Sequence, residues 1–185
     1  ARFDLSSSDM PGQRLSDFGG LSDRSLAENH VGGSEELRRE LARAFGGRSE
    51  EYIVTAGASE ANFALCAALL EPGESVLVER PTYQPLEAIP RGLGASVSSL
   101  IRFESNDFRL TASDARAAAR QGLRLMILTN LNNPTGVALP ANEVQGFADL
   151  AADRGFYLLM DEIFRELDFD RPSPTIGGLN ERVIV

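Results

Sequence analysis

Residues 125–136 read LMILTNLNNPTG, and this stretch decides how the rest of the chain is interpreted. Its first four residues are apolar, as expected of a buried strand. Three asparagines follow within four positions, and a proline and a glycine then turn the chain. An asparagine turn is the ordinary interpretation of such a stretch. The alternative is that a buried strand delivers amide groups to a ligand site.

The same alternation of short apolar runs and helical patterns continues along the chain. Strands rich in Val, Ile and Leu that are separated by helices predict an α/β fold with a mostly parallel sheet flanked by helices. Residues 1–33 show no sustained period and are expected to form an N-terminal arm. The predicted strands are 52–55, 75–78, 95–101, 123–128, 156–160 and 182–185. The predicted helices are 34–45, 58–70 (apolar nearly all round and so expected to be buried), 83–91, 112–120 and 142–153.

The charge of the chain restricts the kinds of molecule that it can bind. The 185 residues carry a net charge of −9, with 27 acidic residues against 18 basic ones, and all 18 are arginine. This balance argues against binding to nucleic acid or anionic membranes. It suits a high-salt habitat, and a codon bias toward arginine is an equal alternative. No apolar run is long enough for a membrane span and no signal pattern is present, so we expect a soluble, cytoplasmic protein.

Metal-binding and disulfide chemistry have few candidates. The chain contains one histidine, His30, and one cysteine, Cys66. A zinc site built from His and Cys is therefore excluded, and so is an internal disulfide. Cys66 lies in an apolar run and is expected to be a packed core thiol, with a reactive thiol as the alternative.

Polar residues follow several predicted strands. In open parallel sheets, ligands bind beyond the carboxyl ends of the strands. The small residues 56–59 lead straight into a helix and form either a phosphate site or an ordinary turn. Tyr83 offers stacking or simple packing. Asp161 ends an apolar strand and is either a helix cap or a buried acid that needs a positive partner.

Together these segments resemble the class I/II pyridoxal-phosphate-dependent aminotransferases (fold type I). The resemblance runs from near residue 4 to the end of the chain. It rests on GSEELR (33–38), VTAGASEA (54–61), PGESV (72–76), RPTY (80–83), NNPTG (132–136) and DEIF (161–164).

The resemblance implies that residues 34–185 are part of the large domain that binds pyridoxal 5'-phosphate. Gly57, Ala58 and Ser59 would hold the phosphate. Tyr83 would stack on the pyridine ring, and Asn133 would donate a hydrogen bond to the phenolic oxygen. The aspartate would pair with the pyridine nitrogen and keep the ring an electron sink. The implied cofactor-binding residues are Gly57, Ala58, Ser59, Tyr83, Asn133, Asp161 and Phe164.

The sequence departs from the family pattern at several places. Phe164 stands where a tyrosine is usual, which removes one hydrogen bond to the cofactor. Ser8 aligns with a glycine near the substrate carboxylate, and residues 28–30 lack the tyrosine that reaches a neighbouring subunit. The chain has no lysine, whereas the reaction needs a Schiff-base lysine. We therefore expect an N-terminal fragment that is inactive alone.

The family implies a homodimer that transfers an amino group between an amino acid and a 2-oxo acid. Two other classes of function stay open. A lyase, decarboxylase or cyclase would use the same cofactor contacts. A regulator or a lysine-free pseudoenzyme would bind the cofactor without turnover.

Overall fold

The computed structural model describes residues 12–19, 31–169 and 175–185. The chain divides into two units, Ala1–Val31 and Gly32–Val185. In the first unit, the described residues contain one short 3-10 helix, η1 (Leu15–Asp17), which is preceded by a hydrogen bond from the backbone N–H of Arg14 to Asp17 Oδ2 (2.8 Å). The predicted boundary between an arm and a domain at residue 33 stays a prediction.

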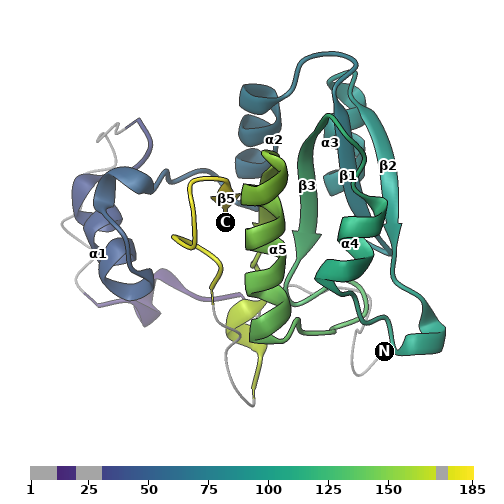
Figure 1. Ribbon diagram of the computed structural model, residues 1–185. Helices are drawn as coiled ribbons and strands as arrows, with labels where there is room; N and C mark the ends of the chain where they lie inside the picture. Colours follow the sequence, from purple (N-terminus) through teal and green to yellow (C-terminus); the bar gives the residue numbers. More distant parts are fainter. Residues whose placement is uncertain (1–11, 20–30, 170–174) are drawn as a thin grey trace. The chain divides into compact units, whose positions relative to one another are not determined.

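The second unit is built on a five-stranded sheet in which every pairing is parallel. The strand order is β2-β1-β3-β4-β5 (Figure 1). This confirms the predicted α/β fold with a parallel sheet. The strands are β1 (Ser75–Arg80), β2 (Ser96–Ile101), β3 (Leu123–Thr129), β4 (Tyr157–Asp161) and β5 (Val183–Ile184).

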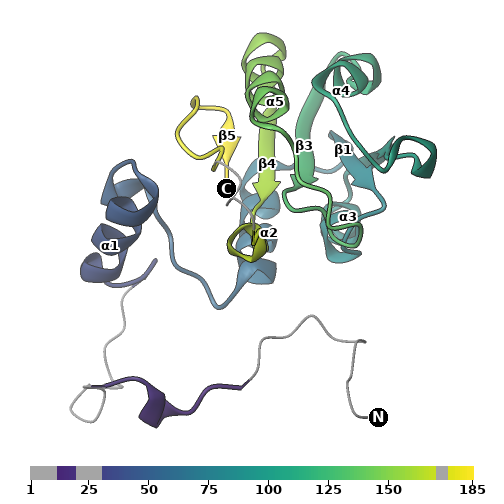
Figure 2. The ribbon, with the colours of Figure 1, turned by 90° about the horizontal axis from the view of Figure 1, so that it is seen from below.

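Helices cover both faces of this sheet (Figure 2). One face carries α2 (Ala58–Leu69) and α3 (Pro85–Gly92), and the other carries α4 (Ala112–Ala118) and α5 (Ala141–Arg154). The predicted helices are confirmed to within a few residues. The remaining described elements are α1 (Glu35–Phe45) and the 3-10 helices η2 (Ser49–Glu51), η3 (Glu104–Asn106) and η4 (Arg165–Leu167).

The two-residue period of the strands produces the two cores. On β3, Leu125 and Ile127 pack into the cluster below α2 and α3. The alternate residues, Met126 and Leu128, pack with Phe147 in the cluster below α4 and α5. All four strand residues are at most 1% exposed, which explains why the strand is apolar without interruption.

The order of the strands creates a switch point. From β1 the chain passes through α3 to β2 on one side, and then through α4 to β3 on the other side of β1. The carboxyl ends of β1 and β3 therefore meet where the direction of winding reverses. In open α/β sheets this is the place where ligands bind.

Two expectations about local structure are wrong. Residues 52–55 form no strand: Ile53 is 77% exposed, and the backbone N–H of Val54 donates to Gly32 O (3.0 Å) without a ladder around it. A strand needs a paired neighbour, and the described sheet ends at β2 and β5. Helix α2 is not buried all round, because the sheet covers only one of its faces and Phe63 on the other is 52% exposed.

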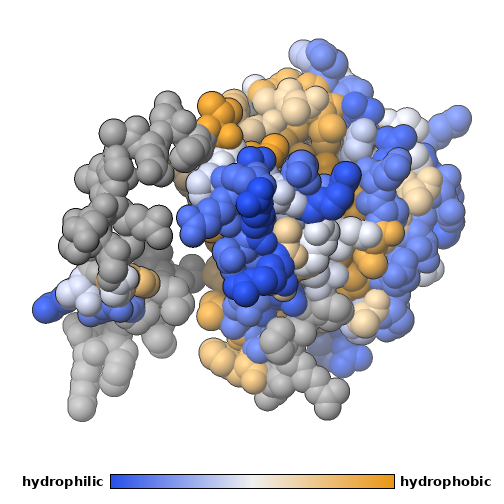
Figure 3. Space-filling model, turned by 90° about the vertical axis from the view of Figure 1, so that its left-hand side faces the viewer, coloured by the Kyte–Doolittle hydropathy of each residue, from blue (hydrophilic) through white to orange (hydrophobic). Residues whose placement is uncertain are grey.

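Helix α1 begins and ends as its sequence predicts. Ser34 accepts a hydrogen bond from the N–H of Leu37, and Gly46 ends the helix at a positive φ of 89°. None of its residues is buried. Figure 3, which views the molecule from the side of α1, accordingly shows mainly hydrophilic residues over the middle of this surface. Among the described helices, none is long and apolar enough to cross a membrane.

Candidate active site

Asp161 is the last residue of β4 and is half-buried at the carboxyl edge of the sheet. Its Oδ1 accepts a hydrogen bond from the backbone N–H of Ile163 (3.1 Å), and its Oδ2 accepts one from Asn62 Nδ2 (3.1 Å). A carboxylate oxygen has two acceptor positions, so each oxygen keeps one for a further donor. The first bond closes a local turn, and no helix begins at Asp161, so the helix-cap interpretation is wrong. The second joins β4 to α2.

Helix α2, whose fifth residue Asn62 makes this contact, begins at Ala58. Gly57 is the residue before the helix, with φ 94° and no side-chain cap on the helix, and a Cβ atom at this position would meet no heavy atom within 4 Å. The first N–H groups of a helix have no partner inside it. Ala58 and Ser59 therefore present free donors at the positive end of the helix dipole, in open space. This is the donor set of an anion site.

One acidic side chain belongs to the same turn. The carboxylate of Glu60 turns back and accepts a hydrogen bond from the backbone N–H of Ala56. Thr55 Oγ1 donates to Gly57 O (3.0 Å). The turn is thus held by its own side chains, and the amide groups of residues 58 and 59 remain outside those bonds.

Asn132 and Asn133, in the loop after β3, have different surroundings. Asn132 makes the turn: its Oδ1 accepts from Thr135 Oγ1 (2.7 Å), and its carbonyl accepts from the N–H of Gly136 (2.7 Å). The side chain of Asn133 has no hydrogen-bond partner within the described part of the chain. The ordinary turn interpretation therefore applies to Asn132. Asn133 keeps its amide available at the sheet edge.

A buried carboxylate ties this loop to the sheet. Glu79, the fifth residue of β1, is 0% exposed and accepts hydrogen bonds at Oε1 from the N–H of Thr129 (2.6 Å) and from Asn132 Nδ2 (2.9 Å). Arg102, which follows β2, donates from Nε to Oε2 (2.8 Å) and from Nη1 to Phe108 O (2.9 Å). Its Nη2 lies 2.7 Å from Oε2 without hydrogen-bond geometry. One carboxylate thus joins the ends of three strands.

Burial and the neighbouring positive charge shift the pKa of Glu79 in opposite directions. Burial raises the pKa of the Glu79 carboxyl, and the Arg102 guanidinium and the hydrogen bonds oppose that rise. Burial also raises the pKa of the carboxyl of Glu162, which follows Asp161 in the chain, and the hydrogen bond from the N–H of Ile176 opposes that rise. Buried acids at a sheet edge are costly without such partners.

Tyr83 lies beyond the carboxyl end of β1 and is 45% exposed, so its ring is accessible. Asn132 Nδ2 is 3.3 Å from Pro81 O, and the N–H of Asn130 donates to Asp161 O (2.9 Å). These bonds place the loop between the segment that carries Tyr83 and the end of β4. Two buried polar atoms near them, Thr82 Oγ1 and Asn130 Nδ2, have no hydrogen-bond partner within the part of the chain that the structure describes.

The remaining predicted residues have different outcomes. Phe164 is half-buried and precedes η4, and its carbonyl accepts from the N–H of Leu167 (2.9 Å). Ser8 and residues 28–30 lie outside the described residues. Sequence reasoning missed Asn62 and Glu79, which connect the predicted residues to one another. The available signal was weak, because α2 and β1 each contain other polar residues.

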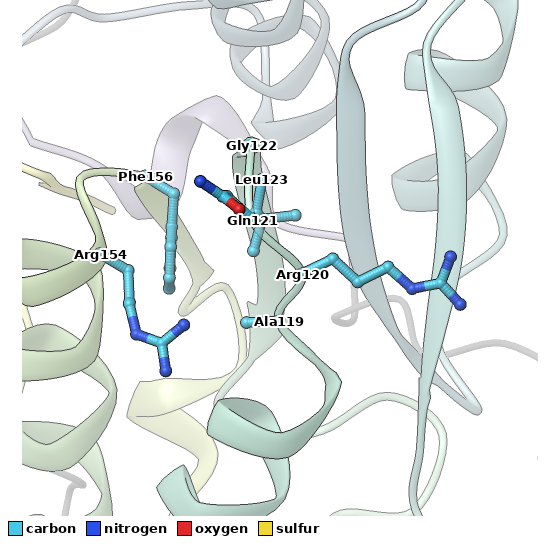
Figure 4. Close-up of a pocket in the computed structure, with 7 residues that line it drawn as sticks. All are labelled: Ala119, Arg120, Gln121, Gly122, Leu123, Arg154 and Phe156. Carbon is cyan, nitrogen blue, oxygen red and sulfur yellow. The ribbon is translucent and has the colours of Figure 1, made fainter.

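A cavity of about 330 Å³ lies at the opposite edge of the sheet (Figure 4). Gly122 and Phe156, which line it, precede β3 and β4, so it opens at the amino ends of these strands. Its two arginines do not converge, because Arg120 points away from Arg154. Among the described residues no cluster of His, Cys, Asp and Glu could hold a metal ion. The carboxyl edge is therefore the candidate site.

Comparisons with known proteins find relatives of this chain. The family model described as aminotransferase class I and II matches residues 27–184. Arginine–pyruvate transaminase of Pseudomonas aeruginosa is 33% identical over an aligned length of 161 residues, and the match covers 82% of this chain and 41% of that protein. A probable N-acetyl-LL-diaminopimelate aminotransferase of Bacillus subtilis is 35% identical over 73% of this chain and 34% of its own length.

Solved structures show the same likeness. Aspartate aminotransferase from Thermus thermophilus with maleate superposes with a TM-score of 0.78 at 30% identity and covers 82% of this chain. N-succinyldiaminopimelate aminotransferase from Mycobacterium tuberculosis gives 0.75 at 30% identity over 84% of this chain. This chain corresponds to 42% and 44% of those two chains. It therefore spans about two fifths of the length of these relatives.

Proposed function

Because this chain belongs to the class I and II aminotransferase family, we propose that the protein containing it is a pyridoxal-phosphate-dependent aminotransferase. It transfers an amino group between an amino acid and a 2-oxo acid. The observation that carries the proposal is the hydrogen bond of 3.1 Å between Asn62 and Asp161, because it ties the first half of α2, a helix with an uncapped start, to the carboxylate that ends β4. Residues 34–185 then form part of the cofactor-binding domain.

The groups at this edge fit the cofactor. The open first turn of α2 matches a phosphate in charge and in donors. The amide of Asn133, without a partner in the described chain, matches a phenolic oxygen. The accessible ring of Tyr83 matches an aromatic face. The free acceptor position of Asp161 matches a protonated ring nitrogen.

Each residue has one task in the mechanism. When bound, pyridoxal phosphate supplies an electron sink for the electrons of a bond to the substrate α-carbon. The N–H groups of Ala58 and Ser59 would hold the phosphate and so fix the position of the ring. Asp161 would accept a hydrogen bond from the protonated ring nitrogen and stabilise its positive charge. Asn133 would donate a hydrogen bond to the phenolic oxygen and orient the reacting group.

The proton transfer needs an amine, and residues 1–185 contain no lysine. We infer that residues outside this chain supply it, so that the chain alone is inactive. The relatives have different substrates in their names, so the proposal concerns the class of reaction and not one amino acid.

We also propose a homodimer. Its support is the exposed apolar face of α2, which contains Phe63 (52% exposed) and the exposed alanines 64, 67 and 68. An apolar helix face of this kind suits burial against a second copy.

The test of the proposed function is Asp161→Ala in the protein made from the complete coding sequence that contains this chain. Turnover of an amino acid with a 2-oxo acid should fall at least about a hundredfold, because a charge that stabilises the reacting state is lost. Asp149→Ala is the matched control, since Asp149 is exposed on α5 and accepts only from Gln145 (2.8 Å). Undiminished turnover in Asp161→Ala would refute the assignment.

A further inference from the structure

Helix α2 buries one polar side chain among apolar ones. Its two buried residues are Asn62, 7% exposed, and Cys66, 1% exposed. Cys66 packs with Leu70 and Val76 in the core below α2, whereas Asn62 is not part of that cluster. A buried amide without a partner would destabilise the fold, so the position needs a reason.

The partner of Asn62 is the carboxylate at the candidate site. Its Nδ2 donates to Asp161 Oδ2 at 3.1 Å, across 99 positions of sequence. The backbone N–H of Ile163 donates to the other oxygen at 3.1 Å. With one donor on each oxygen, the plane of the carboxylate is fixed, because rotation about its bond to Cβ would break both hydrogen bonds.

Asn62 also lies close to the start of its helix. It is four positions beyond Ala58, the first helical residue. With a rise of 1.5 Å per residue, the two are about 6 Å apart along the axis. One rigid element therefore carries both the anion-binding turn and the donor that orients Asp161.

We propose that Asn62 is a positioning residue that aims the carboxylate of Asp161 at the ring nitrogen of a cofactor whose phosphate is held at the first turn of the same helix. This inference rests on the proposed function. A short arm joins the phosphate to the cofactor ring, so the spacing between the phosphate and the ring nitrogen can vary only within a narrow range. Helix α2 sets that spacing, because the hydrogen bond from Asn62 holds the carboxylate of Asp161, at the end of β4, at a fixed position relative to the start of the helix.

The consequence is a change in the proton affinity of the ring nitrogen. Without the donor, Oδ2 rotates away, and the ion pair with the protonated nitrogen lengthens. Weaker pairing lowers the pH at which the nitrogen loses its proton. We expect a fall of about one pH unit, which is a tenfold loss of proton affinity.

The experiment uses the protein from the complete coding sequence, loaded with pyridoxal phosphate that carries ¹⁵N in the ring. The ¹⁵N chemical shift is followed against pH in wild type, Asn62→Leu and Cys66→Ala. Cys66→Ala is the matched control, because it removes a buried side chain one turn along the same face. The titration midpoint should fall in Asn62→Leu and stay at the wild-type value in Cys66→Ala. Asn62→Ala replaces the leucine variant if that one does not fold.

The outcomes separate this inference from the proposed function. An unchanged midpoint in the Asn62 variant overturns the inference, and so does an equal fall in Cys66→Ala, which would indicate loosened packing. A wild-type protein that does not retain the labelled cofactor overturns the proposed function itself.

Discussion

Cys66 is a thiol whose surroundings hold it neutral. It is 1% exposed in the core below α2, and burial raises its pKa to about 11. In the unfolded chain a thiol titrates near about 8.5. Above that pH the unfolded state releases a proton that the folded state keeps, so the free energy of unfolding falls as pH rises. The contribution is fully present below pH ~8.5 and is lost as the pH approaches 11.

We predict that Cys66→Ala flattens the alkaline part of the stability profile. A difference of two to three pKa units corresponds to about 3 kcal/mol between neutral pH and pH 11. The chain suits this test, because it has no lysine and only three tyrosines that titrate nearby. The measurement is urea unfolding at a series of pH values from 7 to 11. If both proteins lose stability with the same slope, Cys66 is not the group responsible. The folded wild-type thiol should also resist alkylation until urea is added.

At the scale of residues, position after a strand predicted where a side chain lies. Asp161 and Asn133 were predicted to lie at the sheet edge because they follow apolar strands, and the structure places both there, whereas their roles stay predictions. Asn62 was not identified, because its partner lies 99 positions away and no local period reports such a contact. Ser8 lies outside the described residues, and its role stays a prediction.

At the scale of elements, Glu79 fastens strands to one another. It receives donors from β3 and from the loop after it, and an arginine that follows β2 neutralises its charge. Both members of the ion pair have side chains that are 0% exposed. Removing one partner of such a pair leaves a buried charge without compensation, which is costlier than removing both.

We predict that Glu79→Gln destabilises the protein by about 3–5 kcal/mol, and that Glu79→Leu combined with Arg102→Met costs less. Urea unfolding of both variants measures the difference. The matched control is Glu40→Gln on α1, whose ion pair with Arg43 is exposed, with side chains 55% and 79% accessible. That change should cost less than about 1 kcal/mol. A double variant less stable than Glu79→Gln would contradict the argument.

The elements that sequence predicted correctly are those with their own buried pattern. Strands β1 and β3 are apolar on both faces because helices cover both, and that pattern is visible in the sequence. Residues 52–55 have strand-like composition, yet Ile53 is 77% exposed and has no strand beside it. Strand-like composition is therefore not sufficient, because a strand forms only where a neighbouring strand is available for hydrogen bonding.

At the scale of the molecule, the parallel sheet was predictable and the strand order was not. Alternating strands and helices require parallel pairing, but they leave open which side of β1 receives each later strand. The observed order places β1 between β2 and β3 and so creates the switch point. The candidate site depends on that order, because Glu79 on β1 can reach donors from β2 and β3 only as their common neighbour.

Because residues 1–185 contain no lysine, the position of the Schiff-base amine can be tested directly. If the proposed function is correct, borohydride reduction of the protein from the complete coding sequence, loaded with pyridoxal phosphate, should leave a pyridoxyl group on a lysine. Residues 1–185 contain no lysine, so peptide mass mapping should find the group outside them. The 185-residue chain alone, treated in the same way, should gain no group on any side chain. Turnover without any labelled lysine would contradict the proposal, because transfer of the α-proton would then use a different base.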